Sequence, residues 1–250
     1  MEFVRLSKQD GIAEVRLERG KVNALDDRAV EELSGCLRQL AEDPEVRGSI
    51  LTGTGKFFSF GFDIPHFLGY SREAFSRYLT NFTALYRELF SHPKPLVAAL
   101  NGHAVAGGCM LALACDARIM AGGKAKIGLN EIGLGSTVFA GSAEMLAFWL
   151  GPRRAEEVLL RGMLYTAEEA QNIGLIDAVA PEGELIDTAR KLVQQHASKE
   201  PAAFRSIKAL LRKPVIDAAA AREPQSIREF VEIWYSAPTW RKLQEIKIHA

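Results

Sequence analysis

The sequence predicts an α/β core followed by a C-terminal α-helical region. Strand-like and helix-like patterns alternate over the first three quarters of the chain, and the pattern is almost entirely helical from about Asp187 onward. At 250 residues the chain has room for one large domain or two small ones, and its 48% hydrophobic content is ample for a buried core. Because no low-complexity linker interrupts the alternation, we expect one continuous unit.

The first half of the chain switches between the two periods. The N-terminus is strand-like, residues 11–18 alternate between apolar and charged side chains as in a half-buried strand, and residues 23–40 have the spacing of a helix. A strand at 47–53 ends in a Gly-Thr-Gly turn, and 57–64 is expected to be an aromatic loop. Residues 75–89 predict a long amphipathic helix, which two following prolines end because proline cannot continue a helix.

The second half continues the alternation and then becomes helical. Thr166 and Glu169 form a capping box, which predicts the start of a helix. In order, we expect a strand at 95–100, a short buried helix at 107–113, a strand at 116–120, a loop that carries Glu131, a helix at 144–150 closed by Gly151-Pro152, a strand at 174–180, and helices broken at Pro201, Pro214, Pro224 and Pro238.

Composition excludes several classes of function. Lys and Arg number 31 against 31 Asp and Glu, so no global field attracts nucleic acid or an anionic membrane. No stretch reaches the ~20 apolar residues of a membrane span, and the N-terminus lacks a signal-peptide pattern. The three cysteines have no CxxC spacing and the five histidines no metal-ligand spacing. We therefore expect a cytoplasmic protein without a metal site, a nucleic-acid partner or a membrane partner.

Familiar catalytic motifs are missing, and this narrows the chemistry further. The chain has no GxSxG elbow, no P-loop and no complete GxGxxG fingerprint. Readings as a serine hydrolase, a nucleoside triphosphatase or a dehydrogenase therefore lack support.

Gly107 and Gly108 precede an apolar helix, which is the first feature that suggests a binding site. Glycine lets a ligand approach the backbone, and a helix N-terminus adds partial positive charge, so the pair suits an oxyanion. The alternative is that the glycines merely let the helix pack tightly. A second donor region is the loop around Gly61, where a sharp turn would present the Phe62 N–H, although the phenylalanine rings themselves suit core packing.

Glu131 lies between Leu129 and Ile132, a setting that suits either a catalytic carboxylate or an ordinary surface-loop glutamate. Carboxylates are rarely placed among apolar residues without a partner or a purpose. If the side chain is buried, its pKa rises towards the range that is useful to a general base.

Several blocks of the sequence together resemble the enoyl-CoA hydratase/isomerase, or crotonase, superfamily. The blocks are KFFSFGFDI at 56–64, PLVAALNGHAVAGGC at 95–109, Cys115-Asp116, and AQNIGLIDAVAP at 170–181. Their order and spacing are compatible with the family over nearly the whole chain, which makes the resemblance more specific than any single glycine motif.

The resemblance implies a fold, an assembly and a substrate class. It implies a crotonase-like spiral of ββα units at 1–190, a C-terminal helical trimerisation region at 191–250, and a homotrimer or a hexamer made of two trimers. The substrate would be an acyl-CoA thioester, so coenzyme A belongs to the substrate and no separate cofactor is expected.

The resemblance also implies roles for particular residues. The backbone N–H groups of Phe62 and Gly107 would hold the thioester oxygen, and Glu131 would be the catalytic base. Contacts to the adenine and pantetheine of coenzyme A would come from the segment near Lys21, and Met110 would line the acyl site. The matching substrate-binding positions are Asn23, Ala24, Leu25, Phe60, Phe62, Asp63, Ile64, Gly107 and Met110.

Met110 departs from the pattern of the family's hydratases. Those enzymes use two glutamates to split water across a double bond, and the first follows Gly-Gly-Cys directly, where this chain has Met110. A thioether exchanges no proton, and losing one acid/base group costs roughly 10²–10⁴-fold in rate. A site with only one glutamate, beside an apolar pocket, resembles that of the Δ3,Δ2-enoyl-CoA isomerases of fatty-acid β-oxidation, which move a double bond with a single base. We expect the helix at 75–89 to line the acyl pocket.

Three alternatives remain open from the sequence. One is a hydratase or lyase-type member in which another residue replaces the missing glutamate, and another is decarboxylation or a related thioester reaction, since one oxyanion hole serves many chemistries. The third is a non-catalytic RNA-binding or scaffold relative. A basic patch would serve RNA binding, although the same residues suit a solvated helix face; it would comprise Arg205, Lys208, Arg212 and Lys213.

Overall fold

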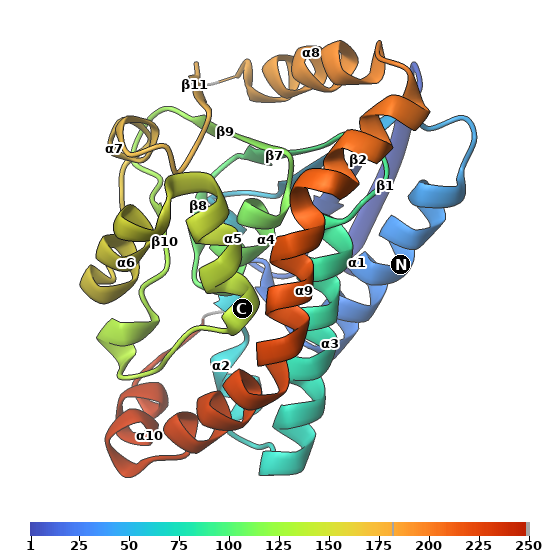
Figure 1. The fold of residues 1–250 in the computed structure, drawn as a ribbon. Helices are drawn as coiled ribbons and strands as arrows, with labels where there is room; N and C mark the ends of the chain where they lie inside the picture. The colour runs from blue at the N-terminus through green and yellow to red at the C-terminus, as the bar shows by residue number, and fades with distance from the viewer. Residues whose placement is uncertain (182, 249–250) are drawn as a thin grey trace.

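A six-stranded sheet is the frame of the protein in the computed structural model, which describes residues 1–181 and 183–248 (Figure 1). Its strand order is β1-β2-β4-β7-β9-β11, and every pairing is parallel except that of β1 with β2. The strands are β1 Val4–Gln9, β2 Ile12–Leu17, β4 Gly48–Gly53, β7 Leu96–Leu100, β9 Ala117–Ala121 and β11 Ala178–Ala180. Parallel pairing needs crossover helices, which the alternating pattern of the sequence supplies.

Two small parallel sheets accompany the main sheet, and their strands contain or directly precede several residues of the candidate site. One has the order β10-β8-β5, and the other pairs β3 with β6. Their strands are β3 Ala24–Leu25, β5 Phe57–Ser59, β6 Gly61–Phe62, β8 His103–Val105 and β10 Ile127–Gly128.

Helices cover both faces of the main sheet. Helix α8 packs on one face over a small cluster that includes Ile50, Val97 and Val193 (Figure 1). The large core lies on the other face. The helices are α1 Asp27–Glu42, α2 Ile64–Phe67, α3 Arg72–Phe90, α4 Gly107–Ala114, α5 Ala140–Leu150, α6 Pro152–Arg161, α7 Ala167–Asn172, α8 Leu185–Ala197, α9 Pro201–Trp234 and α10 Ala237–Gln244, with a 3₁₀ turn at Glu131–Leu134. These elements confirm the predicted α/β class with a C-terminal helical region; the division at residue 190 stays a prediction.

Most expected elements are present, and the differences have local causes. Helix α1 begins at 27 and not at 23, because Asn23 has a φ of +49° and the Asp26 side chain caps the helix by accepting from Ala29 N at 2.9 Å. The expected aromatic loop at 57–64 contains β5 and β6. The predicted capping box is confirmed, since Thr166 N donates to Glu169 Oε2 at 2.8 Å and Glu169 N donates to Thr166 Oγ1 at 3.3 Å.

Three prolines occupy helix positions that differ from those expected from the sequence. Pro152 is the first residue of α6, where its missing N–H costs nothing, so it starts a helix that we did not expect. Helix α9 runs for 34 residues through Pro214 and Pro224, which were wrongly predicted to break it. Both prolines are exposed, and each removes one N–H from the intrahelical hydrogen bonds without ending the helix.

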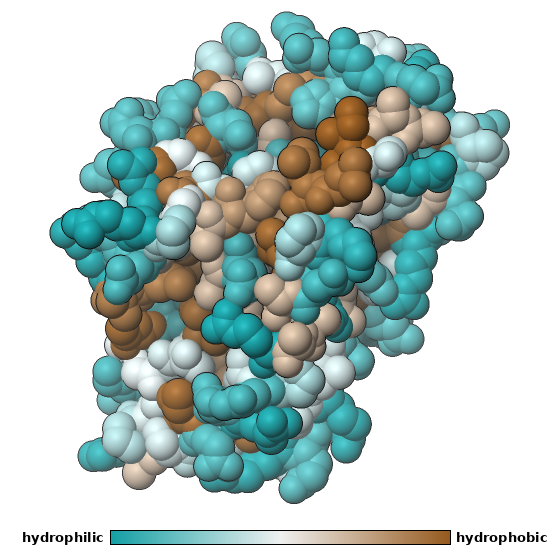
Figure 2. Space-filling view, in the orientation of Figure 1, coloured by the Kyte–Doolittle hydropathy of each residue, from teal (hydrophilic) through white to brown (hydrophobic). Residues whose placement is uncertain are grey.

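Helix α9 runs beside α3 and α5 and joins the tail to the large core (Figure 1). The ring of Trp234 lies 4.5 Å from that of Phe75, and the ring of Phe230 stacks on Phe139 at 4.6 Å between centroids. These aromatic rings of the tail are therefore buried against the protein's own core. The N-terminal half of α9 leaves apolar surface exposed (Figure 2), including Leu210 with 74% of its area accessible.

The four cations considered for a basic patch form neither that patch nor a solvated helix face, because two of them point inward. Asp116 Oδ1 lies 2.7 Å from Lys208 Nζ and 2.9 Å from Arg212 Nη2, and all three side chains are buried. Burial lowers the pKa of Lys208 to about 8. This cluster anchors α9 to the segment between α4 and β9. Lys213, in contrast, is exposed and pairs with Asp217.

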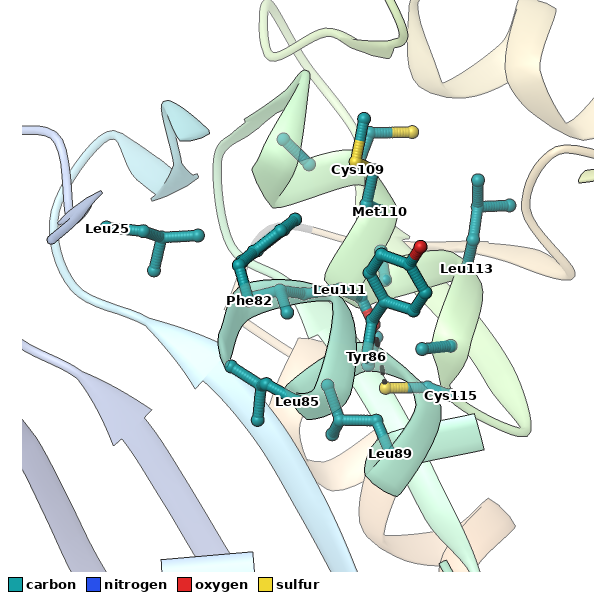
Figure 3. Packing of buried hydrophobic residues seen from close by; sticks show 14 of the residues in the cluster. Leu25, Phe82, Leu85, Tyr86, Leu89, Cys109, Met110, Leu111, Leu113 and Cys115 are labelled. Atoms are coloured by element: carbon teal, nitrogen blue, oxygen red, sulfur yellow. Dashed lines mark hydrogen bonds between the residues drawn. The ribbon is translucent and has the colours of Figure 1, made fainter. Parts of the chain in front are cut away.

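The large core also fixes the position of α4. Figure 3 shows the side chains of α3, among them Phe82 and Tyr86, facing Met110 and Leu111 of α4. All eight residues of α4 are buried. Among residues 1–181 and 183–248, the structure has no helix with the length and apolar character to cross a membrane.

Candidate active site

A cavity of about 210 Å³ lies between β6, the N-terminus of α4, the 3₁₀ turn and the end of α9. Its walls are mostly apolar, and it brings together residues that are more than one hundred positions apart in the sequence. The lining residues are Phe60, Phe62, Ile64, Val105, Ala106, Gly107, Met110, Asn130, Glu131, Leu134, Ser136, Phe139, Phe230, Trp234 and Ile246.

The chain places β6 directly against the start of α4. Gly61 has a φ of +95°, and a Cβ atom there would lie 2.9 Å from the nitrogen of Gly107. A Cβ atom on Gly107 would in turn lie 3.3 Å from Cδ1 of Phe62. The predicted pair, Phe62 and Gly107, is therefore adjacent in space, and glycine is required for this close approach.

The N-terminus of α4 faces the cavity with unusual backbone geometry. Ala106 precedes the helix with a φ of +49°, a conformation that costs a non-glycine residue free energy and that is concentrated at functional sites. Gly107 is the first residue of the helix, so its N–H has no intrahelical acceptor one turn earlier. Gly108 has the alternative role foreseen for the glycine pair, because a Cβ atom there would lie 2.3 Å from Ser59 O.

Glu131 is buried in the cavity wall, with 6% of its surface exposed. Neither carboxylate oxygen has a hydrogen-bond partner among the residues that the structure describes. Burial raises the pKa of Glu131 to about 8, opposed only in part by the residue's own backbone N–H. The 3₁₀ turn holds the residue in place, since Ser136 N donates to Glu131 O at 2.9 Å. The burial of Glu131 excludes the alternative that it is an ordinary surface-loop glutamate. The cavity wall therefore contains one carboxyl group whose pKa lies near neutral pH.

Met110 occupies the wall of the same cavity and is 1% exposed. It also belongs to the large core, where Figure 3 shows it together with Phe82 and Tyr86 of α3. Within the described chain, the only carboxylate that lines the cavity belongs to Glu131. The cavity therefore combines one potential base with an apolar wall where the resemblance led us to look for a second acid.

Five predicted substrate-binding residues line the cavity and four do not. Phe60, Phe62, Ile64, Gly107 and Met110 belong to the lining. The cavity is flanked by the segment of Asn23, Ala24 and Leu25, in which Ala24 and Leu25 pair with β6. The carboxylate of Asp63 forms an ion pair with Arg19, with 2.7 Å between Oδ2 and Nη2.

The side chain of Asn23 is fully occupied in holding a turn. Its Nδ2 donates to Thr54 O at 3.1 Å and to Phe57 O at 2.8 Å, and its Oδ1 accepts from Arg19 N at 3.0 Å. A contact of this segment with substrate stays a prediction, and its backbone would have to make it.

The helix that we expected to line the acyl pocket does not line this cavity. No residue of α3, all of which the structure describes, belongs to the lining. Its aromatic face is covered, because the ring of Phe82 packs edge-on against Phe62 at 4.8 Å. The wall is supplied by Phe230 and Trp234 of α9, which sequence reasoning missed. Their spacing of four residues, one helical turn, was the available signal.

A second, more open cavity of about 750 Å³ shares Phe60 with the first. Lys21, Lys56 and Lys247 line it, and its one lining carboxylate, Glu18, is paired with Arg5 at 3.0 Å. The predicted contact near Lys21 thus lies beside a cationic cavity that opens next to the first.

No cluster of three or more His, Cys, Asp or Glu side chains suited to a metal ion occurs among residues 1–181 and 183–248. His249, one of the five histidines considered above, lies outside the described residues. The chemistry of the cavity therefore has to be considered from Glu131 and the backbone.

The family model described as enoyl-CoA hydratase/isomerase matches residues 7–237 of this chain. The chain belongs to this family. It is accordingly an acyl-CoA-processing member of the enoyl-CoA hydratase/isomerase family, with the crotonase fold that the sequence motifs suggested.

Some relatives of this protein are named as isomerases and others as hydratases. It is 32% identical over 222 residues to mouse enoyl-CoA delta isomerase 1, mitochondrial, covering 88% of this chain and 77% of the mouse protein. It is also 32% identical over 231 residues to the short-chain-enoyl-CoA hydratase of Clostridium acetobutylicum, covering 90% and 88%. The crystal structure of human mitochondrial delta3-delta2-enoyl-CoA isomerase superposes with a TM-score of 0.93 at 30% identity, covering 97% of this chain and 95% of the human chain.

Proposed function

We propose that this protein is a Δ3,Δ2-enoyl-CoA isomerase that moves a double bond by shuttling one proton on Glu131. The carboxylate removes a C2 proton from a 3-enoyl-CoA, and the resulting dienolate carries its negative charge on the thioester oxygen. The same carboxyl group then returns the proton at C4. No water is consumed, and the number of protons on the enzyme is the same before and after the reaction.

The observation that carries this proposal is the pairing of Glu131 with Met110 in one apolar cavity. Water splitting needs a group that donates a proton while another accepts one, and Met110 can do neither. The single carboxyl group has a pKa of about 8, so near neutral pH it can both take and return a proton. The apolar wall at Met110 keeps water away from the intermediate.

The backbone supplies the support for the negative charge. In our proposal the N–H groups of Phe62 and Gly107 donate to the thioester oxygen, and their adjacency through Gly61 supports this role. Such preorganised donors are each worth about 3–4 kcal/mol when comparable donors are removed. The N-terminal end of α4 adds a partial positive charge at the same place.

Coenzyme A would occupy the second cavity. Its phosphates carry negative charge, and Lys21, Lys56 and Lys247 line this cavity next to Phe60, which both cavities share. The acyl group would then extend past Phe60 towards Glu131. A homotrimer or a hexamer also stays our prediction; the exposed apolar side chains of Ile207, Leu210 and Leu211 on α9 support self-association.

The test is conversion of 3-hexenoyl-CoA to the conjugated 2-enoyl thioester, followed by near-ultraviolet absorbance. We expect turnover by the unmodified protein and its loss in Glu131→Ala, with both proteins folded by circular dichroism. Absence of turnover in the folded protein, or unchanged turnover in Glu131→Ala, would rule out the isomerase.

Hydration is the second candidate, and the similarity to the Clostridium hydratase favours it. Crotonyl-CoA hydration measured beside the isomerase assay separates the two activities. Efficient hydration that Glu131→Gln abolishes would make this protein a hydratase in which another group replaces the glutamate that is missing at Met110.

A further inference from the structure

A third cavity, of about 360 Å³, borders the cavity that contains Glu131, which we term the acyl cavity; Phe139 lines both. Helices α5 and α9 lie side by side at this place (Figure 1). On α9, Ser226 lines the third cavity and Phe230 lines the acyl cavity. These two residues are four positions apart, which is about 6 Å along a helix axis. The two cavities therefore follow one another along the seam between α5 and α9.

Two stacked phenylalanine rings lie where the two cavities meet. The rings of Phe139 and Phe230 are 15° from parallel, with 4.6 Å between their centroids. The rings of Phe82 and Phe62 lie 6.2 Å and 6.3 Å from that of Phe139. Phe139 is 0% exposed and Phe230 is 2% exposed. Phe139 is therefore enclosed by aromatic rings and forms part of the wall between the two cavities.

The N-terminus of α5 is fastened to α9 directly beside this wall. Ala140 N donates to Ser226 Oγ at 3.1 Å, and Gly141 N donates to Glu223 Oε2 at 3.2 Å. The first N–H groups of a helix have no intrahelical acceptor, and a carboxylate is favourable next to them. Side chains of α9 thus supply the acceptors that the start of α5 needs. These bonds hold Phe139, which directly precedes α5, in place against α9.

The volume of the acyl cavity sets the size of the group that it can hold. A dry apolar cavity of about 150 Å³ binds benzene, which has six carbon atoms. At the same volume per carbon atom, the 210 Å³ of the acyl cavity hold about eight carbon atoms. The thioester carbonyl carbon is one of them, because Phe62 and Gly107, whose N–H groups we propose as donors to the thioester oxygen, belong to the lining.

We propose that the acyl group of the natural substrate has at most about eight carbon atoms, because Phe139 and Phe230 close the acyl cavity towards the third cavity. This inference rests on the proposed acyl-CoA function and names the length class of its substrate. A longer chain would have to displace these rings. It would then enter a cavity lined by Arg222, Ser226 and Glu229, whose polar groups a hydrocarbon desolvates without giving them a hydrogen bond.

Isothermal titration calorimetry with saturated acyl-CoAs of increasing length measures this limit without requiring catalysis. Each methylene group that becomes buried in the cavity is expected to raise the affinity about fourfold. In the natural protein we expect the affinity to stop rising at or before about octanoyl-CoA, and to gain less than about twofold from octanoyl-CoA to dodecanoyl-CoA. A rise of about fourfold per methylene that continues to dodecanoyl-CoA, or no binding of any of these ligands, overturns the inference.

Two variants assign the limit to the stacked rings. In Phe139→Ala the ratio of the affinities for dodecanoyl-CoA and octanoyl-CoA is expected to rise at least about tenfold over that of the natural protein. Phe148→Ala is the matched control: Phe148 is a partly buried ring on the same helix and does not belong to the lining of the acyl cavity, so the ratio is expected to stay unchanged. Phe230→Leu trims the other ring and should raise the same ratio, so it provides the measurement if Phe139→Ala fails to fold. An unchanged ratio in the folded variants of this wall overturns the inference.

Failure of this inference is distinguishable from failure of the proposed function. Loss of 3-hexenoyl-CoA isomerisation together with a retained length limit in binding refutes the isomerase and keeps the length class. Isomerisation by a protein whose affinity rises continuously to dodecanoyl-CoA refutes the length class and keeps the isomerase.

Discussion

Replacing Glu131 with glutamine is expected to lower activity strongly and, at alkaline pH, to stabilise the folded protein. The carboxyl group has an ordinary pKa of 4.5, and burial raises it to about 8. Between these two pH values the folded protein holds a proton that the unfolded chain has released. The free energy of unfolding of the natural protein therefore falls as pH rises through this window.

The size of the effect follows from the shift. A difference of about 3.5 pKa units corresponds to about 5 kcal/mol once both states are ionised. Only part of this cost is present near pH 5.5, and most of it is present near pH 8.5. Glutamine has nearly the same shape and does not titrate. The stability of Glu131→Gln relative to the natural protein is therefore expected to increase by about 3 kcal/mol between these two pH values.

The assay is urea unfolding of both proteins at equal protein concentration and at each pH, because self-association would otherwise change the apparent stability. Glu168→Gln, at an exposed position of α7, is the control and is expected to show a change within about 0.5 kcal/mol. A stability difference between natural protein and Glu131→Gln that does not change with pH would refute the buried, high-pKa carboxyl.

The pH dependence of activity should also follow the ionisation of Glu131. Because the ionised carboxylate is the base, kcat/KM for 3-hexenoyl-CoA is expected to rise about tenfold from pH 7 to pH 9, with a midpoint at about pH 8. Glu131→Gln should lower turnover by about 10²–10⁴-fold at every pH. A profile that is flat above pH 6 would contradict this assignment.

Three further tests probe the wall, the anchor of α9 and the start of α4, and the last two each include a control variant. Met110→Glu should raise crotonyl-CoA hydration at least about tenfold, because it supplies the missing second acid/base group; hydration that stays at the level of the natural protein would show that position 110 does not select the reaction. Asp116→Ala leaves two buried cations without their carboxylate and should lower the free energy of unfolding by about 3–5 kcal/mol. Lys213→Ala, the control, removes an exposed ion pair and should change the free energy of unfolding by less than about 1 kcal/mol. Equal losses of the two variants in urea unfolding would contradict the buried cluster. Gly108→Ala should destabilise the protein, because the added Cβ would lie 2.3 Å from a backbone oxygen. Gly35→Ala in α1 is the control: its added Cβ meets no atom within 4 Å, so this variant should stabilise the protein by about 0.5–1 kcal/mol. Thermal unfolding in which both variants shift in the same direction would argue against the close packing of α4.

The candidate site was predictable where its residues carry a local signal. Gly107 follows a turn and opens an apolar helix, and Glu131 stands alone among apolar neighbours, so each could be selected from its immediate sequence. Phe230 and Trp234 could not be assigned to the cavity, because helical spacing shows that they share a face but does not show what that face contacts. Phe139, on which the ring of Phe230 stacks, lies about ninety residues earlier in the chain.

The sequence by itself determined the fold class and most elements, because periodicity, capping and turn chemistry depend on residues within a few positions of one another. It indicated the family through the resemblance of several ordered sequence blocks. The tertiary structure alone decided that α9 and not α3 lines the cavity, and that Lys208 points inward to Asp116. It also decided that α9 continues through Pro214, which lies at an exposed position of the helix. In each case the outcome depends on which distant surface buries a helix face, and packing between remote segments sets this choice where local propensity does not.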